Sequence, residues 1–221
     1  MRTLLCIFAS AAITAVTARA ASVTITNPGY EDDVLAPGAW SDATPNGWLD
    51  PDNPGGNPNA NFIEYIAGFA SEGVNHLGFD GNENGIIYQD LSTAWAANTS
   101  YTLTIGVGNR AGGTGAGTGL FGLTSTNDGV IVSNDAFASA LFSQTVDTST
   151  IAPVGGTFGD LVLNYSTGAV APAGNIRIFA KETSGVRIHL DNFRLDATVI
   201  PEPSSLAALG LAGLLMRRRR A

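Results

Sequence analysis

Four aromatic side chains in the first third of the chain have the chemistry of a sugar-binding platform. They lie in or beside a proline-rich stretch at residues 31–61, and they are Trp40, Trp48, Phe62 and Tyr65. An aromatic ring can stack on the apolar face of a sugar while nearby polar groups bind its hydroxyls. The same rings could equally fix a long loop to the hydrophobic core. The sequence therefore offers these four residues as ligand-binding candidates, with a structural role as the alternative.

The residues that catalysis would need are sparse. Neither His76 nor His189 belongs to an H-E-x-x-H metal motif or a G-x-S-x-G nucleophile motif. Alternation along residues 186–190 places His189 on the polar side of a strand, which predicts an exposed histidine beside Asp191. A chain this acidic always offers some carboxylate pair for glycoside hydrolysis, so no single pair is informative. We therefore expect no catalytic residues, and a glycan-active enzyme is the less favoured alternative.

Residues 80–87 read Asp-Gly-Asn-Glu-Asn-Gly-Ile-Ile and match the opening of an EF-hand calcium loop. The twelfth position of this loop is Leu91 instead of the bidentate glutamate, and no helical pattern flanks it. The sequence thus favours a plain hairpin, in which residues 75–80 and 85–91 pair around a turn at residues 81–84.

Both ends of the chain have the pattern of targeting signals. A basic residue, an apolar run and an Ala-x-Ala site make residues 1–20 a secretory signal peptide, so the mature chain is expected to begin at Ala21. At the other end, a short proline-bounded motif precedes an apolar run and four arginines, and this motif is Pro201-Glu202-Pro203. That order resembles the PEP-CTERM sorting signal, which bacterial exosortases recognise.

The resemblance implies a route for the protein. A sorting helix over residues 204–216 would be about 20 Å long, whereas the hydrocarbon core of a bilayer is about 30 Å thick. This tail therefore predicts transient insertion into the inner membrane, with the arginines on the cytoplasmic side. An exosortase would then process the chain near residues 201–203. The product would reach the cell surface or the extracellular matrix of a biofilm.

Composition limits the chemistry of the exported part. Between residues 21 and 199, five basic and 18 acidic residues give a formal net charge of −13. Nucleic-acid binding is excluded, because phosphate recognition needs a basic surface. The chain's single cysteine, Cys6, lies in the signal peptide, so the mature protein has no thiol or disulfide chemistry.

Strand patterns dominate residues 21–199. Apolar residues recur at every second position between glycine, proline and asparagine breaks, which predicts an all-β, two-sheet antiparallel β-sandwich of about nine strands. The strand at residues 101–107 has the clearest alternation. The last strand, residues 186–195, changes phase partway along, which predicts a bulge near Asp191 and Asn192.

The two ends of the predicted domain, residues 27–31 and 190–195, resemble strand-end motifs of jelly-roll carbohydrate-binding modules with a galactose-binding-like fold. The resemblance implies that the first and last strands lie close together. It also implies a structural calcium ion held by Glu31 and Asp191, and carbohydrate as the ligand class. An ordinary pair of surface carboxylates is the alternative to the calcium site.

Together these observations predict three segments: a signal peptide at residues 1–20, a β-sandwich at 21–199 and a sorting tail at 200–221. The favoured function is an exported, exosortase-processed surface or matrix protein that binds extracellular polysaccharide without catalysis. The alternative is a structural protein of the biofilm matrix or surface layer without sugar affinity.

Overall fold

The structure is a computed structural model, and it describes residues 19–51, 61–81, 85–112, 116–127, 140–185 and 187–201. The predicted signal peptide before Arg19 and the sorting tail from Glu202 onward, including Pro203, lie outside these residues. Among the described residues, no helix combines the length and the apolar character needed to cross a bilayer.

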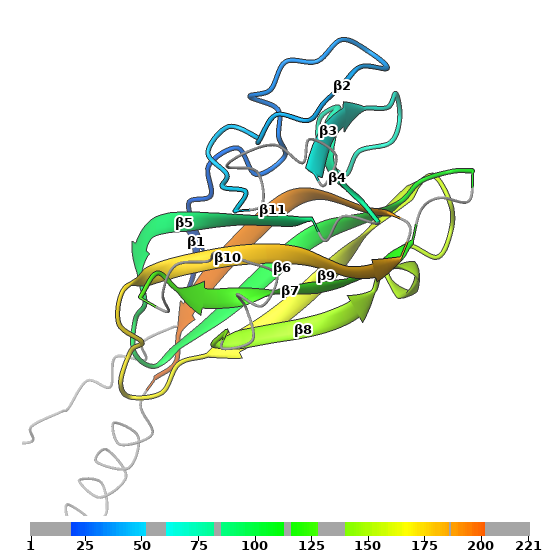
Figure 1. Cartoon of the computed structure of the whole chain (residues 1–221). Coiled ribbons are helices and arrows are strands. Elements are labelled where there is room, and N and C mark those ends of the chain that lie inside the picture. The colour runs from blue at the N-terminus through cyan, green and yellow to red at the C-terminus, as the bar shows by residue number, and fades with distance from the viewer. Residues whose placement is uncertain are drawn as a thin grey trace, which may run out of the picture.

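Two antiparallel sheets face each other and form a sandwich (Figure 1). The larger sheet has the order β2 (Trp40–Ser41), β3 (Asn61–Tyr65), β4 (Asn75–Asp80), β11 (Arg187–Val199), β6 (Thr99–Asn109) and β9 (Thr157–Ser166), and β1 (Ala20–Val23) also pairs with β11. The smaller sheet has the order β5 (Ile86–Ala94), β10 (Asn175–Gly185), β7 (Gly117–Ser125) and β8 (Phe142–Asp147), and a 3-10 turn, η1 (Thr148–Thr150), follows β8. The predicted all-β sandwich is confirmed.

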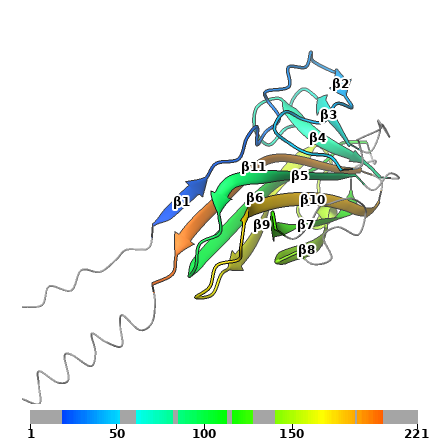
Figure 2. The same cartoon turned by 60° about the vertical axis from the view of Figure 1, so that its left-hand side comes forward.

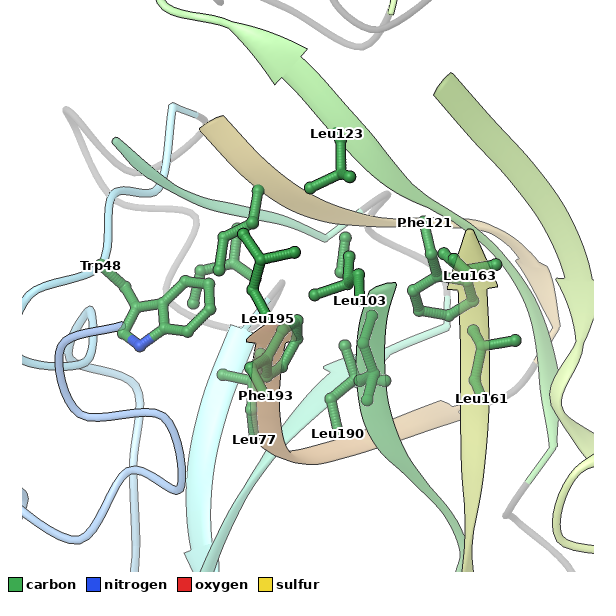
Figure 3. Close-up of a cluster of buried hydrophobic side chains, with 14 of the residues drawn as sticks. Trp48, Leu77, Leu103, Phe121, Leu123, Leu161, Leu163, Leu190, Phe193 and Leu195 are labelled. Carbon is green, nitrogen blue, oxygen red and sulfur yellow. The ribbon is translucent and has the colours of Figure 1, made fainter. Parts of the chain in front are cut away.

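The hydrophobic core fills the space between the two sheets (Figure 3). Strand β6 illustrates how alternation builds it, since Leu103 and Ile105 are fully buried while Thr102 and Thr104 on the opposite face are half-buried. Leu163 on β9 and Phe121 on β7 reach the same core from the two sheets. A strand that buries one face against another sheet needs this period of two.

The predicted hairpin between residues 75–80 and 85–91 is wrong. Strand β4 pairs with β3 and β11 in the larger sheet, whereas β5 pairs with β10 in the smaller sheet. The connection therefore crosses from one layer of the sandwich to the other. Both segments bury apolar side chains in the shared core, so their patterns cannot reveal which sheet each one joins.

The first and last strands do lie side by side, as the family resemblance implied. Strand β1 pairs with β11 from Ala20 opposite Thr198 to Val23 opposite Leu195. The predicted bulge is also present, because the register of β11 against β6 shifts between Asp191 and Arg194.

The bulge in β11 has a clear local cause and consequence. Asn192 adopts the left-handed backbone conformation with φ 48°, which asparagine tolerates better than most residues. The amide of the next residue, Phe193, donates a hydrogen bond to the carbonyl oxygen of Pro28 at 3.0 Å. The shift sends the Phe193 ring into the core and leaves the Asp191 side chain on the outer face of the larger sheet.

Candidate functional site

The four aromatic candidates lie in different environments. Trp40 on β2 is 59% exposed, and Tyr65 at the end of β3 is half-buried. Trp48 is only 3% exposed, packs against Tyr30, and donates its indole N–H to the Asn27 carbonyl oxygen at 3.0 Å. Such a ring cannot stack on a sugar, so Trp48 is a core residue.

Phe62 is also enclosed. Its ring lies over Gly78, where a Cβ atom would overlap it, and the Arg187 guanidinium carbon is 5.2 Å from the ring centroid. The ring is therefore sandwiched between the sheet and a cation. Of the four candidates, Trp40 presents its ring to solvent and Tyr65 does so in part.

Charged groups accompany Trp40. Strands β2 and β3 place Trp40 directly opposite Glu64, so both side chains project from the same face. The Glu64 carboxylate accepts a hydrogen bond from Arg110 Nη1 at 3.2 Å, and its Oε2 is 3.9 Å from His76 Nε2. Glu64 and Arg110 were missed by sequence reasoning, because they are 46 residues apart and no local motif links them.

The two predicted calcium ligands meet at one loop, residues 66–74, which covers the outer face of the larger sheet. Glu31 Oε1 accepts hydrogen bonds from the amides of Val74 and Asn75, both at 2.8 Å. Asp191 Oδ2 accepts hydrogen bonds from the amides of Ser71 at 2.6 Å and Glu72 at 2.8 Å. The two carboxylates thus hold the loop at two points, and we call this arrangement the carboxylate clamp.

Two glycines, Gly29 and Gly73, leave space for the carboxylates of the clamp. A Cβ atom on Gly29 would lie 3.3 Å from Asp191 Oδ1 and 3.6 Å from Glu72 Oε2. Gly73 has φ 58°, and a Cβ atom there would collide with the Glu31 carboxyl group. The described residues contain no group of three or more His, Cys, Asp or Glu side chains arranged to hold a metal ion. Backbone N–H groups therefore supply the partners of both carboxylates in this structure, and calcium binding stays a prediction.

Burial dominates the electrostatics of the clamp. It raises the pKa of Asp191 to about 7, although hydrogen bonds from the Glu72, Ser71 and Asn192 amides oppose the rise. Burial, together with the nearby Asp191 charge, also raises the pKa of the Tyr30 hydroxyl well above its ordinary value. The clamp is thus a titratable contact between the sheet and its covering loop.

Two histidines lie fully buried beneath the same loop. The rings of His76 and His189 are 5.1 Å apart, and Phe69 of the loop contacts both, at 5.0 and 5.4 Å between centroids. None of their four ring nitrogens has a hydrogen-bond partner within the described structure. The sequence assigned His189 to the correct face of its strand, but the predicted exposure is wrong because the loop covers that face.

The environment keeps both histidines neutral. Burial, reinforced by the Arg110 charge, lowers the pKa of His76 to about 4. Burial and then the neighbouring His76 lower the pKa of His189 well below its ordinary value. A charged imidazole would lose its hydration here, and the carboxylate nearest to His76, that of Glu64, already pairs with Arg110.

An open groove of about 510 Å³ runs along the pair formed by the first and last strands. Residues 22–25 and 192–195 form its walls, and Pro28 and Glu72 complete it. Its size falls within the range of small-molecule sites, about 300–1,000 Å³. The groove lies apart from the Trp40 patch, because neither Trp40 nor Glu64 lines it.

These features define the class of the protein: a β-sandwich whose outer sheet face carries an exposed indole beside an ion pair. The PEP-CTERM protein-sorting motif matches residues 199–220, which confirms the predicted sorting signal and marks the chain for export and membrane-associated processing. The chain belongs to the HpiC1-like family, whose model is described as HpiC1 cyclase and matches residues 21–196.

Several solved structures are similar to the chain. TmCBM61 in complex with beta-1,4-galactotriose is 15% identical with a TM-score of 0.45, and the match covers 78% of this chain and 97% of that one. The CBM22-1 xylan-binding domain from Paenibacillus barcinonensis Xyn10C is 15% identical with a TM-score of 0.43, covering 76% and 100%. The enzymatically active domain of bacteriophage CBA120 tailspike protein 4 is 12% identical with a TM-score of 0.46, covering 78% and 21%. No curated protein matches the chain.

Proposed function

We propose that this protein is a non-catalytic polysaccharide-binding domain, which an exosortase processes at the membrane before it reaches the cell surface or extracellular matrix. The observation that carries the proposal is the exposed indole of Trp40 beside the Glu64–Arg110 ion pair. The ring offers an apolar platform, and the carboxylate and guanidinium groups offer an acceptor and donors for sugar hydroxyls.

Binding to extracellular polysaccharide tests this role. Affinity electrophoresis in gels that contain the polysaccharide should show retardation of the native chain, and Trp40→Ala should weaken binding about tenfold, equivalent to about 1.4 kcal/mol. Val162→Ala is the matched control, because Val162 is also exposed but lies on β9. Equal retardation of the native and Trp40→Ala chains would reject the site. Self-association without retardation in any gel would favour the structural matrix alternative.

Processing can be tested separately. Mass spectrometry of the mature product from cells that contain the exosortase should find no peptide from residues 206–221. The detection of this segment intact on the mature protein would reject the processing step.

The calcium ion remains part of the proposal, with Glu31 and Asp191 as its protein ligands. Both side chains reach one loop, and oxygen ligands of this kind suit Ca²⁺. Chelation should lower Tm, and added calcium should restore it, because a ligand that binds the folded state stabilises it. An unchanged Tm after chelation would remove the ion from the proposal while leaving the sugar site untested by that result.

A second candidate is a cyclase, favoured by the family match over residues 21–196 and by the groove beside β1 and β11. A small organic substrate would bind in that groove. Chromatography with mass spectrometry of a metabolite extract should then reveal a ring-closed product with the native chain and none with Thr24→Trp, which fills the groove. Sugar binding by the Thr24→Trp variant should be unchanged, so the two functions can be separated.

A further inference from the structure

Both ends of the described chain leave the sandwich at the same place. Strand β1 starts and β11 finishes side by side, at one end of the molecule (Figure 2). We call this the terminal end and define it by residues 92–100, 164–176 and 197–201. The amide of Ile200 donates to the Asn98 carbonyl oxygen at 2.6 Å, and the Asn98 amide donates to the Gly168 carbonyl oxygen at 2.8 Å. The three segments are therefore joined into one surface.

The terminal end differs in composition from the rest of the domain. Residues 21–199 contain 23 charged side chains, of which 18 are acidic, but the three segments of the terminal end contain none. Exposed aliphatic side chains occupy it instead: Val170 is 85% exposed, Val199 59% and Ile200 40%. This surface is thus uncharged and partly apolar on a strongly acidic domain.

The sorting signal follows this surface without a linker. The last residue of β11 is Val199, and the matched motif begins at that residue. An extended chain covers at most about 3.6 Å per residue, so Ser204, where the apolar run begins, lies within about 18 Å of Val199. A chain whose sorting signal is held at the membrane therefore keeps its terminal end close to the lipid headgroups.

Charge determines which side of the domain can approach that membrane. Anionic lipid headgroups on the outer face of the inner membrane repel an acidic surface, and this repulsion falls off within a Debye length. The uncharged terminal end avoids this repulsion. If cleavage follows Ala20 as predicted, the new α-amino group belongs to Ala21, which pairs with Ala197 at the terminal end, and it would attract anionic headgroups.

We propose that the terminal end is a membrane-docking surface, which rests on the lipid headgroups while the PEP-CTERM motif is processed. The partner is the bilayer surface, and Val170, Val199 and Ile200 insert shallowly among the headgroups. Docking fixes the orientation of the domain. Strand β11 then points away from the membrane, and the sugar-binding candidate Trp40 lies on the side of the domain far from the lipid.

The test measures contact between single positions and lipid. The mature chain, which begins at Ala21 and keeps its sorting tail, has no native cysteine, so an environment-sensitive fluorophore can be attached to a cysteine introduced at position 170 or 154. Val154 is the matched control, because it is 62% exposed and lies between Ala152 and Gly156, which both hydrogen-bond to Asn109 at the opposite end of β6. The chains are reconstituted in vesicles of phosphatidylethanolamine and phosphatidylglycerol that carry a headgroup-attached quencher.

The probe at position 170 should show a blue shift and strong quenching, and the probe at position 154 should show neither. Equal quenching at the two positions would overturn the proposal. Quenching at position 170 that requires added exosortase would overturn it as well, because the partner would then be a protein.

A linker tests whether the terminal end binds lipid by itself or lies near the membrane only because the sorting signal holds it there. A flexible Gly-Ser segment inserted between Ile200 and Pro201 should leave the quenching at position 170 in place, whereas its loss would mean that the surface has no affinity of its own. Val199→Asp in the linker-containing chain should abolish the quenching, and Val162→Asp on β9 should not. If Val199→Asp had no effect, the proposed contact would be refuted.

Discussion

The buried histidine pair makes a quantitative prediction about acid stability. His76 has a pKa of about 4 in the folded chain, against 6.5 for an ordinary histidine. The unfolded chain therefore binds more protons than the folded chain between these two values, so the stability that neutral His76 supports is present above pH 6.5 and is lost as the pH falls towards 4. This pKa difference corresponds to a loss of about 3 kcal/mol in the free energy of unfolding. That is a substantial part of the 5–15 kcal/mol typical of a domain.

Substitution of His76 by phenylalanine tests this reasoning, because it keeps an aromatic ring and removes the titrating nitrogens. The free energy of unfolding can be measured by urea titration with tryptophan fluorescence. Between pH 7 and pH 4 it should fall by about 3 kcal/mol less in the His76→Phe chain than in the native chain. Above pH 6.5 the variant should be at least as stable, since it no longer buries two nitrogens without partners.

The titration of Asp191 does not affect the difference between the native and His76→Phe chains. Asp191 has a folded pKa of about 7 and stabilises the fold as the pH falls through that value, but it is present in both chains and cancels in the difference. His189→Phe is a second variant with the same expected direction, because burial lowers the pKa of His189 as well. If native and His76→Phe chains lost the same stability on acidification, the imidazole could not be buried and neutral as described.

Three further predictions concern the loop at residues 66–74 and the opposite side of the sandwich. Asp191→Ala should reduce the free energy of unfolding by about 3 kcal/mol, because three amides lose their carboxyl acceptor, and hydrogen exchange should then be fastest in the loop. Gly73→Ala should reduce it by about 1–3 kcal/mol, because a side chain at φ 58° is strained and meets Glu31. Glu182→Gln should increase stability above pH 7, because burial and the Asp80 charge raise the pKa of Glu182 to about 7 and its ionisation at higher pH opposes folding.

Each of these variants has a control. Asp196→Ala removes an exposed carboxylate five residues beyond Asp191 and should leave the hydrogen exchange of the loop unchanged. Gly68→Ala has a similar positive φ, 77°, but meets no neighbouring atom, so it isolates backbone strain from the collision with Glu31. Glu182→Gln should bring no gain near pH 5, where the native carboxyl is protonated; an equal gain at both pH values would contradict the assigned titration.

Much of the strand structure and the sorting signal can be predicted from residue patterns, because both depend on residues that are neighbours in the sequence. Alternation along residues 101–107 determines which side chains of β6 are buried, and the change of phase after Leu190 requires a bulge wherever Phe193 and Leu195 are also to be buried. The order of motif, apolar run and arginines likewise identifies the sorting signal without any fold.

The candidate sites could not be predicted in this way, because they depend on which segments meet. The sequence cannot place β4 and β5 in different sheets, since both bury similar apolar side chains. Nor can it show that Glu64 meets Arg110, or that residues 66–74 cover His189, because each contact joins segments far apart in the chain.

The amino-acid sequence by itself determined that this chain is an exported, acidic, all-β protein with a sorting signal, because composition and periodicity act over neighbouring residues. Only the tertiary structure decided which aromatic rings are exposed, because burial depends on what packs above each face. It assigned Trp48 to the core and left Trp40 in solvent. It also gathered three uncharged segments at the end of the sandwich from which the sorting signal leaves, a surface created by strand pairing and by hydrogen bonds between loops.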